Sequence, residues 1–420
     1  MADITANKPL LTAADGTPLK AKLRQTQQRM KLRALGLVVP LLAFILVTFV
    51  LPIGMMLYRS IDNPVMSQIM PKTTQALRAW DGRELPSDEI WRIVAEELVA
   101  GHKNKEIGRV ATRLNYDLPG TRSMITSTAR KLDRWDGDGS VRDFMIGANR
   151  KWGDIGTWTT IKMASPRFTE SFYLMALDMR YDDQGSIVRQ QEDRQIYVML
   201  FGRTLWVSLT ITVLCILLAY PISYLMATLP LRHSNLLMIL VLLPFWTSLL
   251  VRTTSWIVLL QTQGVLNDIM VALGLLGDED RIQMIYNMTG TIVAMTHILL
   301  PFMVLPLYSV MKTISPSYVR AAQSLGATPA RAFWKVYFPQ SVPGIGAGSI
   351  LVFILAVGYY ITPALVGGRT GQLISNFIAY WMQEVHWSLA AALGGLLLAG
   401  VLALYWLYNW LIGIDNMKLG

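Results

Sequence analysis

The sequence has little charge for its length. Only 16% of its 420 residues are Asp, Glu, Lys or Arg, whereas these residues make up about 25% of a soluble globular domain. Hydrophobic residues make up 53% of the chain, and the missing charge is concentrated in a few long stretches. This pattern is typical of a membrane protein. The net charge of +10 does not indicate a nucleic-acid partner, because many of the cations flank apolar runs, where they suit lipid headgroups.

Cysteine and the common catalytic motifs are scarce as well. The one cysteine, Cys215, lies inside an apolar run, so no disulfide is possible within the chain and a small buried side chain is expected. The chain has no G-x-x-x-x-G-K-[ST] loop for ATP and no H-E-x-x-H motif or Cys/His cluster for a metal. The acidic run 136–140 resembles the start of a calcium loop, but Gly147 replaces the closing Glu. We therefore expect no catalytic residue, metal or cofactor in this chain.

Six stretches without Asp, Glu, Lys or Arg are long enough to cross about 30 Å of hydrocarbon. They are residues 34–58, 204–231, 235–251, 282–311, 342–368 and 387–414. A further amphipathic segment, 253–267, is predicted to be interfacial or re-entrant. The sequence therefore predicts an all-α membrane protein with six transmembrane helices.

The charges that flank these spans predict the orientation of the chain. Six cations between residues 20 and 33 directly precede the first span and indicate a cytoplasmic N-terminal tail, residues 1–33. The loop with Arg320, Arg331 and Lys335 then lies inside, and the acidic loop around Asp278 lies outside. The C-terminus, residues 415–420, returns to the cytoplasm.

Residues 59–203, here called the insert, have ordinary soluble composition and separate the first two spans. With the N-terminus inside, the insert is expected to be periplasmic and mainly helical. Apolar spacing and Ser87 as N-cap predict a helix that ends near Gly101. Further helices are predicted at 105–114, 121–132, 141–149 and 186–199, the last leading into the second span.

The loop 312–343 between the fourth and fifth spans carries the clearest local pattern. Ser317 is predicted to cap a short helix that ends at Gly326, and Pro329 suits the first turn of a second helix. A helix, a glycine break and a second helix would then project from the membrane. Such an element is suited to transmitting force from a partner protein.

The spacing in this loop is similar to the signature of permease subunits of binding-protein-dependent ABC importers. That signature is E-A-A, three residues, Gly, nine residues, then I-x-L-P. The matching positions here are Ala321, Ala322, Gly326 and Pro339, with Val336 and Phe338 as apolar substitutes. Arg320 stands in place of the Glu, which predicts a compensating acid on the partner or an altered docking geometry.

The resemblance covers residues 200–414 and is strongest to the spermidine/putrescine permease branch, including the runs 356–358 and 363–368. It implies the type I ABC importer permease fold for residues 204–414, with 312–343 as the loop that couples to the ATPase. It also implies a bacterial inner-membrane complex with a cytoplasmic ABC ATPase dimer, a second permease subunit (expected to be a paralogue) and a periplasmic solute-binding protein. ATP and Mg²⁺ would be used by the ATPase, so this chain would not be an enzyme.

The substrate is expected to be a small polar, polyamine-like solute. The acidic residue that polyamine permeases often carry after Ala-Val-Gly is replaced by Tyr359, followed by Tyr360. These two rings and Trp381 would supply aromatic faces to a cation along the path. Packing at the membrane interface is the alternative role for these three side chains.

Two other functions remain open on the sequence alone. A secondary transporter or channel would normally keep ionisable groups at membrane depth, and His297 is the only such candidate within a predicted span. A membrane sensor would use the insert as its receptor. Neither explains the loop 312–343.

Overall fold

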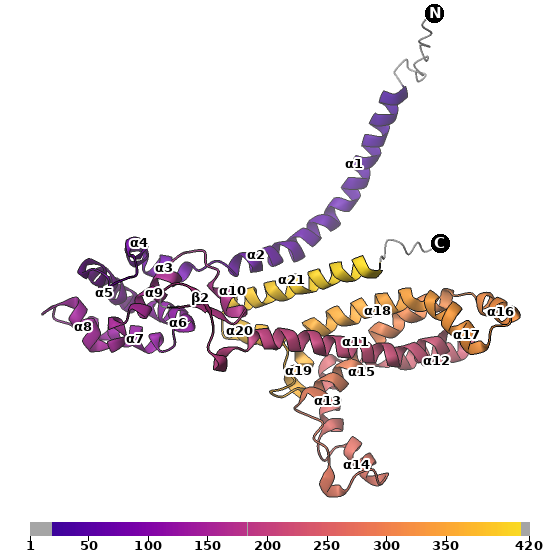
Figure 1. Cartoon of the computed structure of the whole chain (residues 1–420). Coiled ribbons are helices and arrows are strands. Elements are labelled where there is room, and N and C mark those ends of the chain that lie inside the picture. Colours follow the sequence, from indigo (N-terminus) through magenta and orange to yellow (C-terminus); the bar gives the residue numbers. More distant parts are fainter. Residues whose placement is uncertain (1–18, 183, 413–420) are drawn as a thin grey trace, which may run out of the picture. The chain divides into compact units, whose positions relative to one another are not determined.

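The structure is a computed structural model and describes residues 19–182 and 184–412 (Figure 1). Its contacts divide the chain into two units, Met1–Tyr58 and Arg59–Gly420. The first unit is one long helix built from α1 (Leu19–Ile45), a π-helical turn (Leu46–Val50) and the start of α2 (Leu51–Arg59). Residues Thr26–Arg59 are long and apolar enough to cross a membrane, in line with the first predicted span.

The insert forms the first part of the second unit and is mainly helical. Its helices are α3 (Pro64–Ile69), α4 (Pro71–Ala79), α5 (Asp88–Lys103), α6 (Ile107–Asp117), α7 (Thr121–Leu132), α8 (Val141–Ala148), α9 (Ile155–Ala164) and α10 (Ser171–Ala176), with a 3₁₀ turn at Arg150–Gly153. The predicted helix 121–132 is found as predicted, and its neighbours are found with ends shifted by a few residues.

The predicted helix 186–199 is wrong. This region holds strand β2 (Ile187–Arg189), which pairs antiparallel with β1 (Met179–Tyr181), and a 3₁₀ turn at Glu192–Arg194. The turn between the strands is set locally, because Asp182 Oδ1 accepts a hydrogen bond from the backbone N–H of Ser186 (2.7 Å) and Gly185 adopts φ +78°. The next helix therefore starts only at Tyr197.

The insert has a core of its own, built around three fully buried tryptophans. The rings of Trp91 and Trp158 are 4.5 Å apart in an edge-to-face contact, and Trp152 lies beside both. Each indole N–H donates a hydrogen bond, to Pro86 O, Thr128 Oγ1 and Trp152 O. Large apolar side chains with satisfied polar atoms are what a water-soluble core requires.

The rest of the second unit is a helical bundle. Helices α11 (Tyr197–Thr228), α15 (Met288–Thr313) and α18 (Phe338–Gly358) pack side by side (Figure 1). Glycine permits the close approach of α18 to α15, because a Cβ on Gly348 would lie 3.2 Å from the backbone oxygen of Met303. The apolar helices α12 (Leu231–Leu242) and α21 (Trp387–Ile412) also belong to this part of the chain.

Within the described residues, five helices are long and apolar enough to span a membrane, or six if one bent pair counts as a span. The bent pair falls on the third predicted span, 235–251, which is therefore not one helix. The chain runs through α12, a 3₁₀ turn at Leu243–Trp246, α13 (Leu249–Leu260) and α14 (Val265–Ala272), and bends by 98°. Pro244 removes a backbone donor at the bend, and Ser248 caps the new helix through Val251 N (3.2 Å).

The fourth and fifth predicted spans also differ from the helices that form there. Helix α15 begins at Met288 rather than at residue 282, because Asn287 Oδ1 caps it through Gly290 N (3.0 Å). The stretch 342–368 is also not one helix: α18 ends at Gly358, and α19 (Ile361–Val366) follows a two-residue break. Helix α20 (Ile374–Gln383) then leads to the turn before α21, while a 3₁₀ turn at Asp278–Asp280 precedes α15.

Candidate functional site

The loop between α15 and α18 contains two short helices, α16 (Pro316–Ser324) and α17 (Pro329–Ala332), and a π-helical segment at Phe333–Tyr337. The predicted N-cap Ser317 is wrong by two residues. Ser315 is the cap, because Pro316 occupies the first helical position, where a missing N–H costs nothing. Gly326 follows α16 with φ +89°, and Thr328 caps α17, as the glycine break and Pro329 predicted.

The surface of this loop is exposed and carries apolar side chains. Leu325 is 90% exposed, and Tyr318 and Trp334 are 55% and 61% exposed. Arg320 and Ala321 are also exposed on α16, Ala322 is half-buried beside them, and Pro339 lies in the first turn of α18. Apolar side chains that remain uncovered within a single chain are a mark of an interaction surface.

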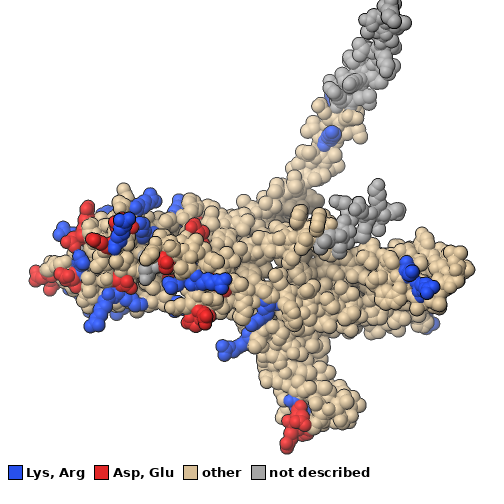
Figure 2. Space-filling model, viewed as in Figure 1, with Lys and Arg blue, Asp and Glu red and all other residues tan. Residues whose placement is uncertain are grey.

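The charge of the loop has one sign. Residues 312–343 contain Lys312, Arg320, Arg331 and Lys335 and no Asp or Glu. Figure 2 shows Lys and Arg without Asp or Glu at the end of the second unit that carries α16 and α17. Arg320 makes no ion pair with any described residue. The loop therefore presents a cationic and apolar surface.

An aromatic cluster ties the loop to the bundle. Tyr224 of α11 lies 5.1 Å from Tyr337 and 5.6 Å from Phe333, measured between ring centroids, and both contacts are edge-to-face. Tyr220, one turn away on α11, lies 6.1 Å from Phe333. Packed rings therefore connect α11 to the π-helical segment that follows α17. No local sequence pattern indicates this contact, since its two sides are more than 100 residues apart.

The break after α18 brings two of the three predicted path residues together. Tyr359 and Tyr360 form the break, and α20 binds both of their backbone oxygens: Ser375 Oγ donates to Tyr359 O (2.6 Å) and Asn376 Nδ2 donates to Tyr360 O (2.7 Å). Backbone oxygens at a helix end need such partners when the helix does not continue. The Tyr360 side chain is 45% exposed.

Trp381 lies apart from this break, near the other end of α20. Its indole N–H donates to Tyr197 Oη (2.9 Å), and its ring meets Tyr116 and His386 edge-on. Tyr116 belongs to the insert, so Trp381 lies where the insert contacts the bundle. The three aromatic residues therefore do not form one group.

A polar group in the bundle was missed by the sequence reasoning. Trp256 Nε1 of α13 donates to His297 Nδ1 of α15 (3.1 Å). Arg252, one turn before Trp256, has a buried Nε atom without a hydrogen-bond partner among the described residues. The predicted third span does not include Arg252, because the apolar stretch ends at residue 251, directly before it.

Comparison with known proteins agrees with these features. Residues 206–412 match the family model of the binding-protein-dependent transport system inner membrane component. The spermidine/putrescine transport system permease protein PotB of Salmonella typhimurium is 32% identical over 215 residues, which cover 50% of this chain and 74% of PotB. PotB of Haemophilus influenzae is 35% identical over 183 residues, covering 43% of this chain and 63% of that relative.

A solved structure of a bacterial ABC transporter involved in the import of the acidic polysaccharide alginate has 19% sequence identity and a TM-score of 0.43, covering 55% of this chain and 81% of that one. The match to PotB carries the assignment, because it combines more than 30% identity with most of the relative's length. The chain belongs to the family of binding-protein-dependent transport system inner membrane components.

Proposed function

We propose that this chain is the permease subunit of an ATP-driven importer in the bacterial inner membrane, with a path for a small polar solute delivered by a periplasmic binding protein. The family and the PotB relatives support this function, and a polyamine-like solute follows from the names of those relatives. The comparisons give no support to a secondary transporter, a channel or a sensor. A second permease subunit, a paralogue, would complete the path.

The exposed element α16–Gly326–α17 is the observation that carries this proposal. We assign the contact with the cytoplasmic ATPase dimer to Arg320, Ala321, Ala322, Gly326 and Pro339. ATP and Mg²⁺ would bind to the ATPase, and closure of its two halves would move this loop. The aromatic contact with Tyr224 would pass that movement to α11.

The proposed orientation puts this loop in the cytoplasm and the insert in the periplasm. In Figure 1, α16 and α17 lie at one end of the second unit and the insert helices at the other. The cytoplasmic N-terminal tail, residues 1–33, lies partly outside the described residues, and the C-terminal segment 415–420 lies wholly outside them.

The translocation path is assigned to the region of the break after α18. Tyr359 and Tyr360 would contact the solute there, and α20, which carries Trp381, would hold the break in place. Their aromatic faces suit an ammonium group through cation–π contacts.

Substitution of Gly326 tests the coupling role. The position is open, since a Cβ meets no atom within 4 Å, but its φ of +89° costs an L-residue about 1–2 kcal/mol. Gly326→Val should abolish both uptake and co-purification of the ATPase, whereas Gly326→Asn, which tolerates this backbone, should retain most of both. Normal uptake and normal ATPase assembly in Gly326→Val would contradict the proposal.

A further inference from the structure

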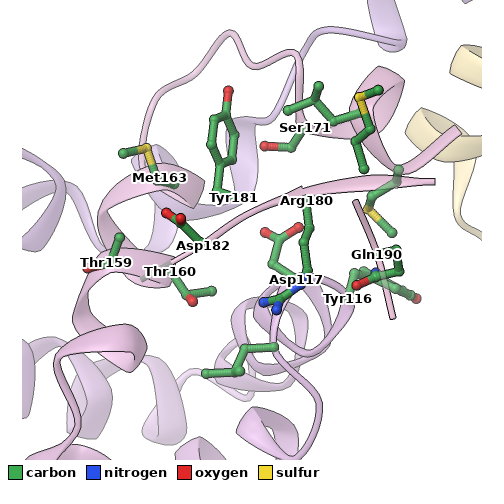
Figure 3. A pocket seen from close by; sticks show the side chains of 14 residues that line it. Tyr116, Asp117, Thr159, Thr160, Met163, Ser171, Arg180, Tyr181, Asp182 and Gln190 are labelled. Atoms are coloured by element: carbon green, nitrogen blue, oxygen red, sulfur yellow. The ribbon is translucent and has the colours of Figure 1, made fainter. Parts of the chain in front are cut away.

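An open cleft of about 870 Å³ lies between the insert and the turn that joins α20 to α21. Its walls come from α3, α6, α7 and α10 on one side and from residues 384–389 on the other. Figure 3 shows a second cavity in the insert, between α6, α9, α10 and β1, with a volume of about 30 Å³. That cavity has room for about one water molecule, whereas the larger cleft is within the size range of ligand sites.

Positive charge dominates the cleft. Five basic side chains line it against two carboxylates, Asp62 and Glu384, and Asp62 already pairs with Arg167 at 3.4 Å. The basic residues are Arg59, Lys105, Arg109, Arg113 and Arg122. Arg109 and Arg113 are four residues apart and lie on one side of α6, and Lys105 lies in the turn directly before this helix. Gly108 and Thr112 also line the cleft and leave room beside the longer chains.

The opposite wall adds to this field. Helix α21 begins at Trp387, and His386, Trp387 and Ser388 line the cleft where it starts. The first N–H groups of a helix point away from its body and carry its positive end, which favours anions. The two walls therefore attract negative charge to the same space.

Arg113 is a buried cation in the wall of the cleft. It is 95% buried and is held by Asn63 Oδ1 (3.0 Å to Nε), Asp117 Oδ2 (2.5 Å to Nη1) and the ring of Phe172. Its Nη2 has no hydrogen-bond partner among the described residues. A buried guanidinium donor without a partner is costly unless an acceptor reaches it.

Backbone strain occurs on both sides of the cleft. Lys105 and Val385 adopt φ values of +61° and +63°, and both line it. A β-branched residue such as Val385 rarely adopts this conformation, and strain of this kind is concentrated at functional sites. Val385 and Trp387 are 69% and 44% exposed, so apolar surface adjoins the cations.

We propose that this cleft binds an acidic segment of the solute-binding protein, with carboxylates facing α6 and apolar side chains on Val385 and Trp387. The inference rests on the proposed importer function. A protein segment fits better than a small anion because the volume is large and because apolar surface adjoins the charges. Docking there contacts the insert and the start of α21 together.

The experiment uses the full transporter in nanodiscs of neutral phosphatidylcholine and measures the Kd of its solute-binding protein. Lys105→Glu with Arg109→Glu should weaken docking by on the order of tenfold or more, equivalent to about 1.4 kcal/mol for each factor of ten. Docking to the unmodified chain should also weaken as salt rises, and less so in the variant. Acid-to-base changes on the docking segment of the binding protein should restore affinity to the variant.

Arg130→Glu with Arg134→Glu is the matched control, because these exposed residues of the insert have the same spacing and lie outside the cleft. Equal Kd values for the two double variants would overturn the proposal. The proposal would also be overturned if the cleft bound only added phosphatidylglycerol, since a lipid headgroup would then be the occupant. Co-purification of the ATPase with the unmodified chain distinguishes the docking proposal from the proposed importer function. If the ATPase did not co-purify with the unmodified chain, the importer function itself would be contradicted.

Discussion

The insert and the helical bundle are both helical, but their interiors are built from different residues. The insert packs Trp91, Trp152 and Trp158 together and satisfies each indole N–H. The bundle brings α15 and α18 close through Gly344 and Gly348. In water, burial of large apolar side chains drives folding. In lipid that drive between helices is absent, and close backbone contact takes its place.

The largest expected effect is loss of a tryptophan from the insert. Trp158→Ala removes a fully buried ring and should destabilise the insert by about 3–5 kcal/mol. Limited proteolysis of the full chain in detergent should then cleave within 59–203 while α11–α21 stay intact. Trp135→Ala, a half-buried control, should cost less. Simultaneous loss of both regions would show that they are not separate folding units.

A small-to-large substitution tests the close packing of helices in the bundle. Gly348→Leu should destabilise the α15–α18 contact by about 1–3 kcal/mol, because its Cβ would meet Met303. A lowered Tm in detergent, with the tryptophan fluorescence of the insert unchanged, is the expected result. Gly400→Leu is the control, since nothing lies within 4 Å of a Cβ there. Equal Tm values for the two variants would refute close packing as the source of stability.

Asp178 joins the two regions, and its loss should have an intermediate effect. Its carboxylate accepts hydrogen bonds from the backbone N–H groups of Ile196, Tyr197 and Val198 at 3.1, 3.0 and 2.8 Å, where α11 begins. Asp178→Ala should cost about 0.5–2 kcal/mol. Faster amide exchange at the start of α11 would confirm the cap, and Asp178→Asn should retain part of it.

The smallest effect is a pH dependence at the contact between the regions. Burial lowers the pKa of His386 below its ordinary value of 6.5, and Tyr116 Oη lies 2.6 Å from its Nδ1. The unfolded chain therefore binds more protons at mildly acidic pH. The stability of this contact is complete above pH 6.5 and falls as the pH drops towards the lower pKa of the folded chain. His386→Gln should remove this slope in a Tm series from pH 7.5 to 5; an unchanged slope would assign it to other groups.

Local chemistry explains which elements the sequence predicted. Helix α7 and the break at Gly326 were predicted because periodicity, Gly and Pro act within a few residues. The stretch 235–251 was predicted as one span because apolar composition measures length and not continuity. The contact between Tyr116 and His386 joins residues 270 positions apart, so no local pattern indicates it. Both residues of that contact line the cationic cleft, so no local pattern predicts the cleft either.

Helix α20 has a consequence for the exchange of parts between relatives. Near its start it holds the backbone of Tyr359 and Tyr360, and near its end Trp381 and the following His386 meet Tyr116 of the insert. The insert is therefore not freely exchangeable between relatives. A chimera that takes residues 59–203 from another permease must also take α20 and the turn before α21, or the graft will lack its matching surface.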